Sequence, residues 1–164
     1  MENFADLLKA NEEYAQHFTQ EELTGFAQKG LAIVTCMDSR IDPLRIVGMH
    51  AGDAKILRNA GARVTEDVLR TLVLATHLLG VKRVLVMPHT DCRMASAEES
   101  EIHQQIKEAS GIDTRGIEIR TVRDQNKALF QDIQRVESYP LLPQGIKVMG
   151  AIYDVKTGLI SPIN

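Results

Sequence analysis

Two cysteines and one histidine are the residues of this chain that best suit metal chemistry. Cys36 ends an apolar run, and His89 and Cys92 form a His-x-x-Cys segment further along the chain. Two thiolates and one imidazole suit Zn²⁺ better than Mg²⁺ or Ca²⁺, which prefer oxygen ligands. Three strong ligands leave one tetrahedral position open, as in catalytic rather than structural zinc sites. Asp38 is expected in or beside that fourth position.

Two alternatives explain the same residues without a metal. Two buried cysteines beside a hydrogen-bonded histidine would be ordinary core residues, because free cysteine is among the most buried residue types. A redox pair is the second alternative, because thiols at adjacent strand ends can reach the Cα separation of about 4.4–6.8 Å that a disulfide needs. The chain has no Cys-x-x-Cys motif, so we expect a disulfide mainly after loss of metal.

A sheet must bring these residues together, because they lie far apart in the sequence. Apolar, β-branched runs predict four strands, and three of them end in the notable residues. In open α/β sheets, ligands bind beyond the carboxyl ends of the strands, where the strand order reverses. The site is therefore expected on one rim of the sheet. The expected strands are 31–36, 54–58, 82–87 and 146–153.

Helical patterns fill the connections between these strands. Thr65 is the expected N-cap of a nearly all buried helix that ends at Gly80, and capping patterns at Ser96 and Thr121 begin two more helices. The alternation predicts a single α/β domain with right-handed crossovers and helices on both faces of a mostly parallel sheet. That sheet should contain about four parallel strands and a short antiparallel edge strand at 159–160. The two further helices should cover 96–109 and 121–139.

Length and composition exclude several classes of protein. A chain of 164 residues fits one domain, here 1–164, with an N-terminal helical arm at 1–28 and an α/β core at 31–164. Its 19 basic and 22 acidic residues give a formal charge of -3 and no polybasic stripe, so we expect no nucleic-acid partner. The acidic N-terminus lacks a secretory h-region, and the longest apolar stretch is interrupted by charges. We therefore expect a cytoplasmic protein that does not cross a membrane.

Three motifs, in this order along the chain, closely resemble the signature of β-class carbonic anhydrases: CMDSR at 36–40, RNAG at 58–61 and HTDC at 89–92. The chain looks like a short bacterial form, over about residues 31–154. The resemblance implies one zinc ion per chain held by Cys36, His89 and Cys92. It also implies reversible hydration of CO₂ to bicarbonate and a proton by zinc-bound hydroxide.

The resemblance further implies a dyad of Asp38 and Arg40 beside the metal. Arg40 can hold the carboxylate bidentately, which keeps Asp38 ionised and off the metal. Because two thiolates cancel the formal charge of zinc, an acceptor that orients the hydroxide becomes useful, and Asp38 is placed to be one. If Asp38 bound the metal instead, the site would be closed and inactive. Gly61 is expected either to offer a backbone N–H to a substrate oxygen or to be a simple turn glycine.

The resemblance also implies a homodimer or a higher even oligomer. An apolar stripe of Phe4, Leu7, Leu8 and Tyr14 marks a helix over about 2–18, which has no place of its own in the sheet. In the family, the N-terminal helix lies on the partner subunit. That arrangement would bury the stripe.

Two alternative functions would use the same residues. The resemblance reaches enzymes that hydrolyse COS or CS₂ at the same kind of zinc site, and a non-catalytic zinc- or bicarbonate-binding protein closed by Asp38 is a third hypothesis. One departure from the family pattern is Arg93, which replaces the usual glycine after the second cysteine, so the loop is expected to adopt a conformation open to ordinary residues. Asp91 is expected to cap the loop or to orient His89.

Overall fold

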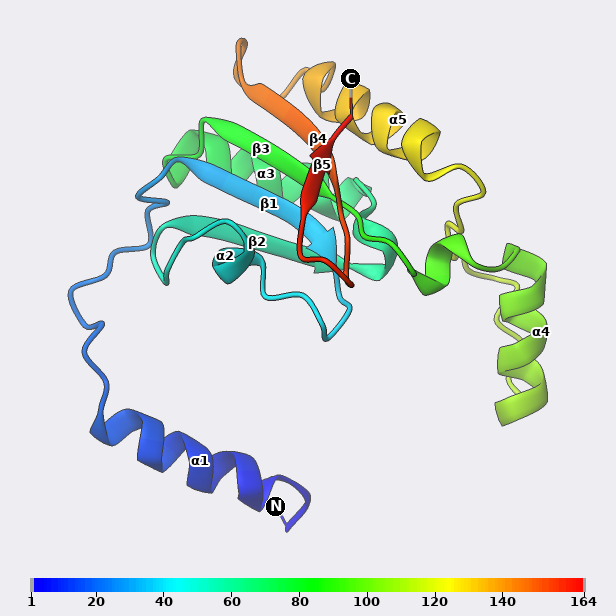
Figure 1. Ribbon diagram of the computed structural model, residues 1–164, viewed down its shortest axis with the longest axis horizontal. Coiled ribbons are helices and arrows are strands. Elements are labelled where there is room, and N and C mark those ends of the chain that lie inside the picture. The colour runs from blue at the N-terminus through cyan, green and yellow to red at the C-terminus, as the bar shows by residue number, and fades with distance from the viewer. Residues whose placement is uncertain (1, 164) are drawn as a thin grey trace.

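The computed structural model describes residues 2–163 and has a five-stranded sheet at its centre (Figure 1). The strand order is β2-β1-β3-β4-β5, with the first four strands parallel and β5 antiparallel to β4. The predicted fold class is therefore confirmed. The strands are β1 (Leu31–Cys36), β2 (Ala54–Asn59), β3 (Arg83–Met87), β4 (Lys147–Tyr153) and β5 (Ile160–Pro162).

Strand β1 is the centre of the fold, and every one of its residues is buried. Its apolar, β-branched sequence suits a strand covered on both faces. The chain runs from β1 to β2 on one side, and then crosses to β3 on the other side of β1. The strand order thus reverses between β1 and β3, and the carboxyl ends of these two strands lie next to each other.

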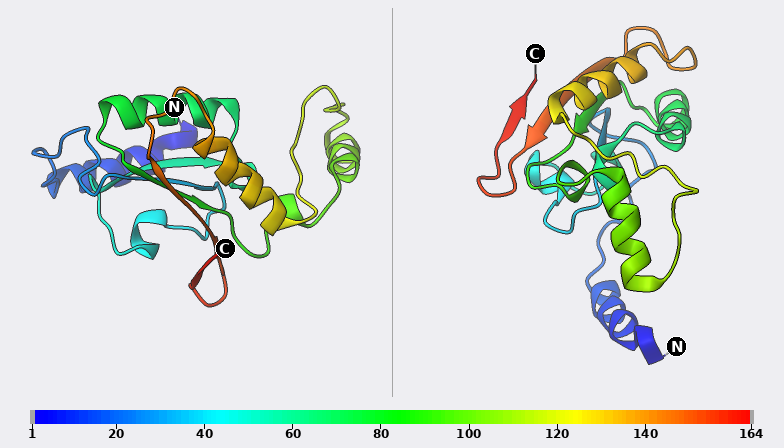
Figure 2. Two further views of the ribbon diagram at one scale, coloured as in Figure 1. Left: turned by 90° about the horizontal axis from the view of Figure 1, so that it is seen from above. Right: turned by 90° about the vertical axis from the view of Figure 1, so that its right-hand side faces the viewer.

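The two faces of the sheet are covered unequally. Helices α3 (Glu66–Leu78) and α5 (Gln125–Glu137) pack on one face, where they share an apolar cluster with β1 and β3 (Figure 2). The other face is covered by the short helix α2 (Pro43–Ile46) and by the loops around it. Two short 3₁₀ turns, η2 (Ala60–Ala62) and η3 (Arg93–Ala95), follow β2 and β3.

Two helices project from the body of the molecule. Helix α1 (Ala5–Gln16) follows the turn η1 (Glu2–Phe4) and has no buried residue, and α4 (Glu99–Ser110) stands off the opposite side (Figure 1). The apolar stripe predicted for the first helix is exposed in this single chain, with 56–62% of each residue's surface accessible. Within residues 2–163, no helix is long and apolar enough to cross a membrane.

The predicted N-cap Thr65 is confirmed, since its hydroxyl accepts a hydrogen bond from the backbone N–H of Val68. The prediction that this helix is nearly all buried is wrong. Leu74 and Leu78 are 45% and 62% exposed, because α3 packs on the sheet along one face only.

The two predicted capping boxes are also wrong in position. Helix α4 is capped by Glu98 with Glu101, because Ser96 belongs to the preceding turn and its hydroxyl donates to the carbonyl of Arg93. Helix α5 begins after Asp124, which is itself the N-cap and accepts from the N–H of Lys127.

Candidate metal centre

The carboxyl ends of β1 and β3 bring the three predicted metal ligands together. Cys36 is the last residue of β1, and His89 and Cys92 lie in the loop that follows β3. All three residues are buried, and their ligand atoms lie within 4.8 Å of one another. The two Sγ atoms are 4.0 Å apart.

The geometry and the donor set fit zinc. Tetrahedral zinc with Zn–S bonds of about 2.3 Å would place two thiolate sulfurs roughly 3.8 Å apart, close to the observed separation. Among the described residues, His89 Nε2 is the one buried side-chain polar atom without a hydrogen-bond partner. The other ring nitrogen, Nδ1, lies 2.8 Å from the carbonyl of Thr90, which leaves Nε2 as the free metal-binding atom. Both cysteines are free thiols.

The two thiols also polarise each other. The hydrogen bond from Cys92, with further help from His89 and the N–H of Gly61, lowers the pKa of Cys36 to about 3 against the effect of burial. The same hydrogen bond, together with burial, raises the pKa of Cys92. Because cysteine binds a metal ion as the thiolate, a dication bound between the two sulfurs would displace the thiol protons.

Asp38 and Arg40 form the predicted dyad at the edge of this cluster. Arg40 donates from Nε and Nη2 to the two carboxylate oxygens of Asp38 at 2.9 and 2.7 Å, and the backbone N–H of Arg40 donates to Oδ1. These bonds hold the pKa of Asp38 well below its usual range, so the carboxylate is ionised. Its Oδ2 lies 3.7 Å from His89 Nε2.

Several unpredicted contacts fix the loops that carry the ligands. The guanidinium of Arg58, on β2, donates to the carbonyls of Cys36, Ile41 and Asp38 at 2.8, 3.2 and 2.6 Å. Gln125, the first residue of α5, donates to the carbonyl of His89 at 2.8 Å. The RNAG motif marks Arg58 as notable, but its sequence does not indicate which carbonyls it binds.

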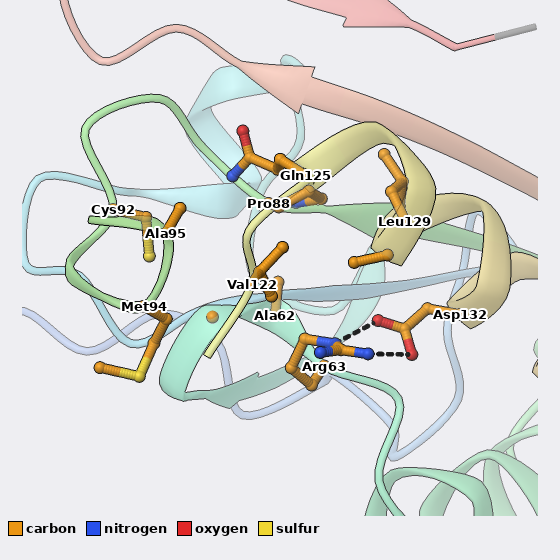
Figure 3. A pocket seen from close by; sticks show the side chains of 12 residues that line it. Ala62, Arg63, Pro88, Cys92, Met94, Ala95, Val122, Gln125, Leu129 and Asp132 are labelled. Carbon is orange, nitrogen blue, oxygen red and sulfur yellow. Dashed lines mark hydrogen bonds and ion pairs between the residues drawn. The ribbon is translucent and has the colours of Figure 1, made fainter. Parts of the chain in front are cut away.

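A small cavity adjoins the cluster between η2, the loop after β3 and α5 (Figure 3). Cys92 and Gly61 line one part of it, and the ion pair of Arg63 and Asp132 lines another. Its volume is about 10 Å³, room for roughly one water molecule.

Comparison with known proteins shows the family of this chain. The carbonic anhydrase family model matches residues 31–139. β-Carbonic anhydrase 1 of Mycobacterium tuberculosis is 32% identical over 158 residues, covering 96% of each chain. The chain belongs to the β-carbonic anhydrase family.

Solved structures and a second group of relatives extend this result. The crystal structure of carbonic anhydrase from Streptococcus mutans has a TM-score of 0.92 and 37% identity, and the match covers 100% of this chain and 99% of that one. Carbon disulfide hydrolase of Acidithiobacillus thiooxidans is 28% identical over 80% of this chain and 76% of its own length.

Three further residues near the cluster were the subject of predictions from the sequence. Arg93, in place of the family's glycine, lies in the turn η3, and its φ is not positive. The loop therefore has a backbone conformation that ordinary residues adopt, as predicted. Its side chain donates to Gln105. Gly61 does have a positive φ of 82°, and its N–H lies 3.4 Å from Cys36 Sγ. The hypothesis that Asp91 orients His89 is not met, because Thr90 holds the ring and Asp91 contacts Arg40.

Proposed function

We propose that this chain is a zinc enzyme, with one zinc ion per chain, that interconverts CO₂ and bicarbonate. The observation that carries the proposal is the buried cluster of Cys36, His89 and Cys92 beside an ionised Asp38 that Arg40 holds. Zinc at such a site lowers the pKa of a coordinated water and so supplies a hydroxide nucleophile near neutral pH.

The residues around the site have separable roles in this proposal. The thiolates of Cys36 and Cys92 and the Nε2 of His89 hold the metal, and the two negative charges offset the charge of the cation. Asp38 accepts a hydrogen bond from the nucleophile and orients its lone pair toward CO₂. Arg40 binds both carboxylate oxygens, which keeps Asp38 ionised and away from the metal. Gly61 remains the proposed donor to a substrate oxygen, beside its contact with Cys36.

The substitution Asp38→Asn tests the role of the carboxylate. We expect the variant to retain zinc, because the three ligands are unchanged, and to lose most CO₂ hydration. The control is Asp113→Asn, because Asp113 and Arg115 form the same Asp-x-Arg ring on the loop after α4. Full hydration activity in Asp38→Asn would exclude the assigned role.

Hydrolysis of CS₂ is the second candidate, favoured by relatives that are named carbon disulfide hydrolases. CO₂ is preferred because the matching family model is that of carbonic anhydrase, and because the carbonic anhydrases of Mycobacterium tuberculosis and Streptococcus mutans are more similar to this chain than the carbon disulfide hydrolases are. Release of H₂S from CS₂ by the zinc-loaded chain, at a rate above its CO₂ hydration, would reverse this preference. A permanently closed site is less well supported, because Asp38 is bound to Arg40 rather than to the cluster.

We also propose that two copies of the chain associate through the exposed helix α1. Its apolar stripe, with Phe4, Leu7 and Leu8, has no cover within residues 2–163, and such a stripe is costly in water. Light scattering should give at least a dimer, and Leu7→Glu with Leu8→Glu should weaken it. A monomeric wild-type chain would contradict this part of the proposal. A cytoplasmic location, the absence of nucleic-acid and membrane partners, and the single domain 1–164 remain predictions.

A further inference from the structure

The guanidinium of Arg40 has a second partner residue, on the loop that carries His89 and Cys92. Nη1 of Arg40 donates to Oδ2 of Asp91 at 2.8 Å, and Nη2 donates to the backbone carbonyl of Asp91 at 3.2 Å. Asp91 lies between His89 and Cys92 in the sequence. Arg40 therefore connects the loop after β1 with the loop after β3.

The second Asp-x-Arg ring in the chain shows what this connection adds. Arg115 binds Asp113 through the same backbone and side-chain atoms as Arg40 binds Asp38, but the structure shows no further acceptor for Arg115 among the described residues. The ring thus forms from local sequence alone. The contact with Asp91 is the feature that distinguishes Arg40.

The backbone at Asp91 is shaped for this contact. Asp91 has a φ of 56°, in the left-handed region that Asp and Asn tolerate better than most residues. In this conformation the carboxylate and the carbonyl of Asp91 both meet the same guanidinium. Both side chains remain accessible to water, with 44% of Arg40 and 68% of Asp91 exposed, so Arg40 has room to turn away when it is not held.

We propose that Asp91 is a positioning residue that keeps Arg40 on Asp38 and thereby keeps Asp38 off the metal. Without Asp91, the guanidinium is held on one edge only and leaves Asp38 more often. A released Asp38 is then the nearest carboxylate to the metal, because its Oδ2 is already 3.7 Å from His89 Nε2. This inference rests on the proposed function, because it concerns access to the same metal.

The test measures access to the metal without measuring turnover. The chain is loaded with Co²⁺, and azide is titrated while the visible absorption of the cobalt is recorded. Asp91→Asn removes the charge and keeps a residue that tolerates the left-handed backbone. We expect azide to bind about two- to fivefold more weakly, the range that the loss of an exposed ion pair allows. Asp113→Asn is the matched control and should bind azide as the wild type does.

A double variant decides whether Asp91 acts through Asp38. In the Asp38→Asn background, the added Asp91→Asn should not weaken azide binding, because no carboxylate is left to compete. Equal weakening in both backgrounds, or unchanged azide affinity in Asp91→Asn, would overturn the inference and leave the proposed function intact. A wild-type chain that takes up no cobalt or zinc would contradict the proposed function and, with it, this inference.

Discussion

The ion pair of Arg63 and Asp132 supports the segment that carries Gly61. The free energy of unfolding that is lost when one partner is removed can be calculated from the burial of the pair. Arg63 Nε lies 2.7 Å from Asp132 Oδ2, and the two side chains are only 19% and 6% exposed (Figure 3). The side-chain amide of Asn59 donates to the carbonyl of Arg63 and accepts from its N–H, which fixes Arg63 directly after the turn η2. The ion pair of Arg63 and Asp132 therefore joins this turn to helix α5. Asp132→Leu would leave the guanidinium without its counterion in a largely dry site.

The expected loss follows from the burial of the pair. Breaking a fully buried pair costs about 3–5 kcal/mol, and because Arg63 keeps some contact with water we expect about 3 kcal/mol. At about 2.1 cal/mol/K per residue, the unfolding entropy of this chain is about 0.34 kcal/mol/K, so Tm should fall by about 9 °C. The double variant Arg63→Met with Asp132→Leu removes both charges and should unfold within about 1 kcal/mol of the wild type.

Thermal unfolding of the zinc-loaded chain, followed by circular dichroism at one protein concentration, measures both variants. Recovery of Tm in the double variant supports the reasoning. A double variant as unstable as Asp132→Leu alone would refute it, because the loss would then come from packing rather than from an unpaired charge.

Three further predictions concern the metal, the pH response and the packing. Cys36→Ser removes one of three ligands and should lower bound zinc well below one per chain, as metal analysis after dialysis would show. The N–H groups of Ile119 and Arg120 lower the pKa of Glu99 below its ordinary 4.5. The stabilisation is therefore present above that value and is lost as pH falls through the folded pKa. The protection factor of the Ile119 amide, which is its exchange rate corrected for the intrinsic rate at each pH, should fall in acid, and it should be low at all pH values in Glu99→Gln. Gly150→Ala should cost about 1–3 kcal/mol in chemical denaturation, because the added Cβ would clash with Ile133 on α5.

The sequence predicted the sheet well, and it picked out three residues that the structure brings together, for physical reasons. Buried parallel strands have continuous apolar, β-branched sequences, so 31–36 was located to the residue and the other parallel strands to within one residue at each end. The candidate ligands could be picked out because few residue types bind zinc. Contacts between side chains far apart in sequence were not predictable in this way. Nothing in the sequence shows that Arg58 reaches three carbonyls or that Asp91 reaches Arg40.

The errors also have local physical causes. Several polar residues precede α4, and all of them are able to cap a helix, so the choice of Glu98 over Ser96 depended on the geometry of the turn η3. The exposed face of α3 carries the leucines Leu74 and Leu78. An apolar sequence pattern does not distinguish a helix face that packs within the chain from one that is exposed.

Zinc content and stopped-flow CO₂ hydration, measured on one purified sample across pH, test the central claim most directly. The account predicts close to one zinc per chain and a hydration rate that rises toward alkaline pH, as the supply of hydroxide at the metal increases. Stoichiometric zinc with no CO₂ hydration at any pH from mildly acidic to alkaline would contradict it.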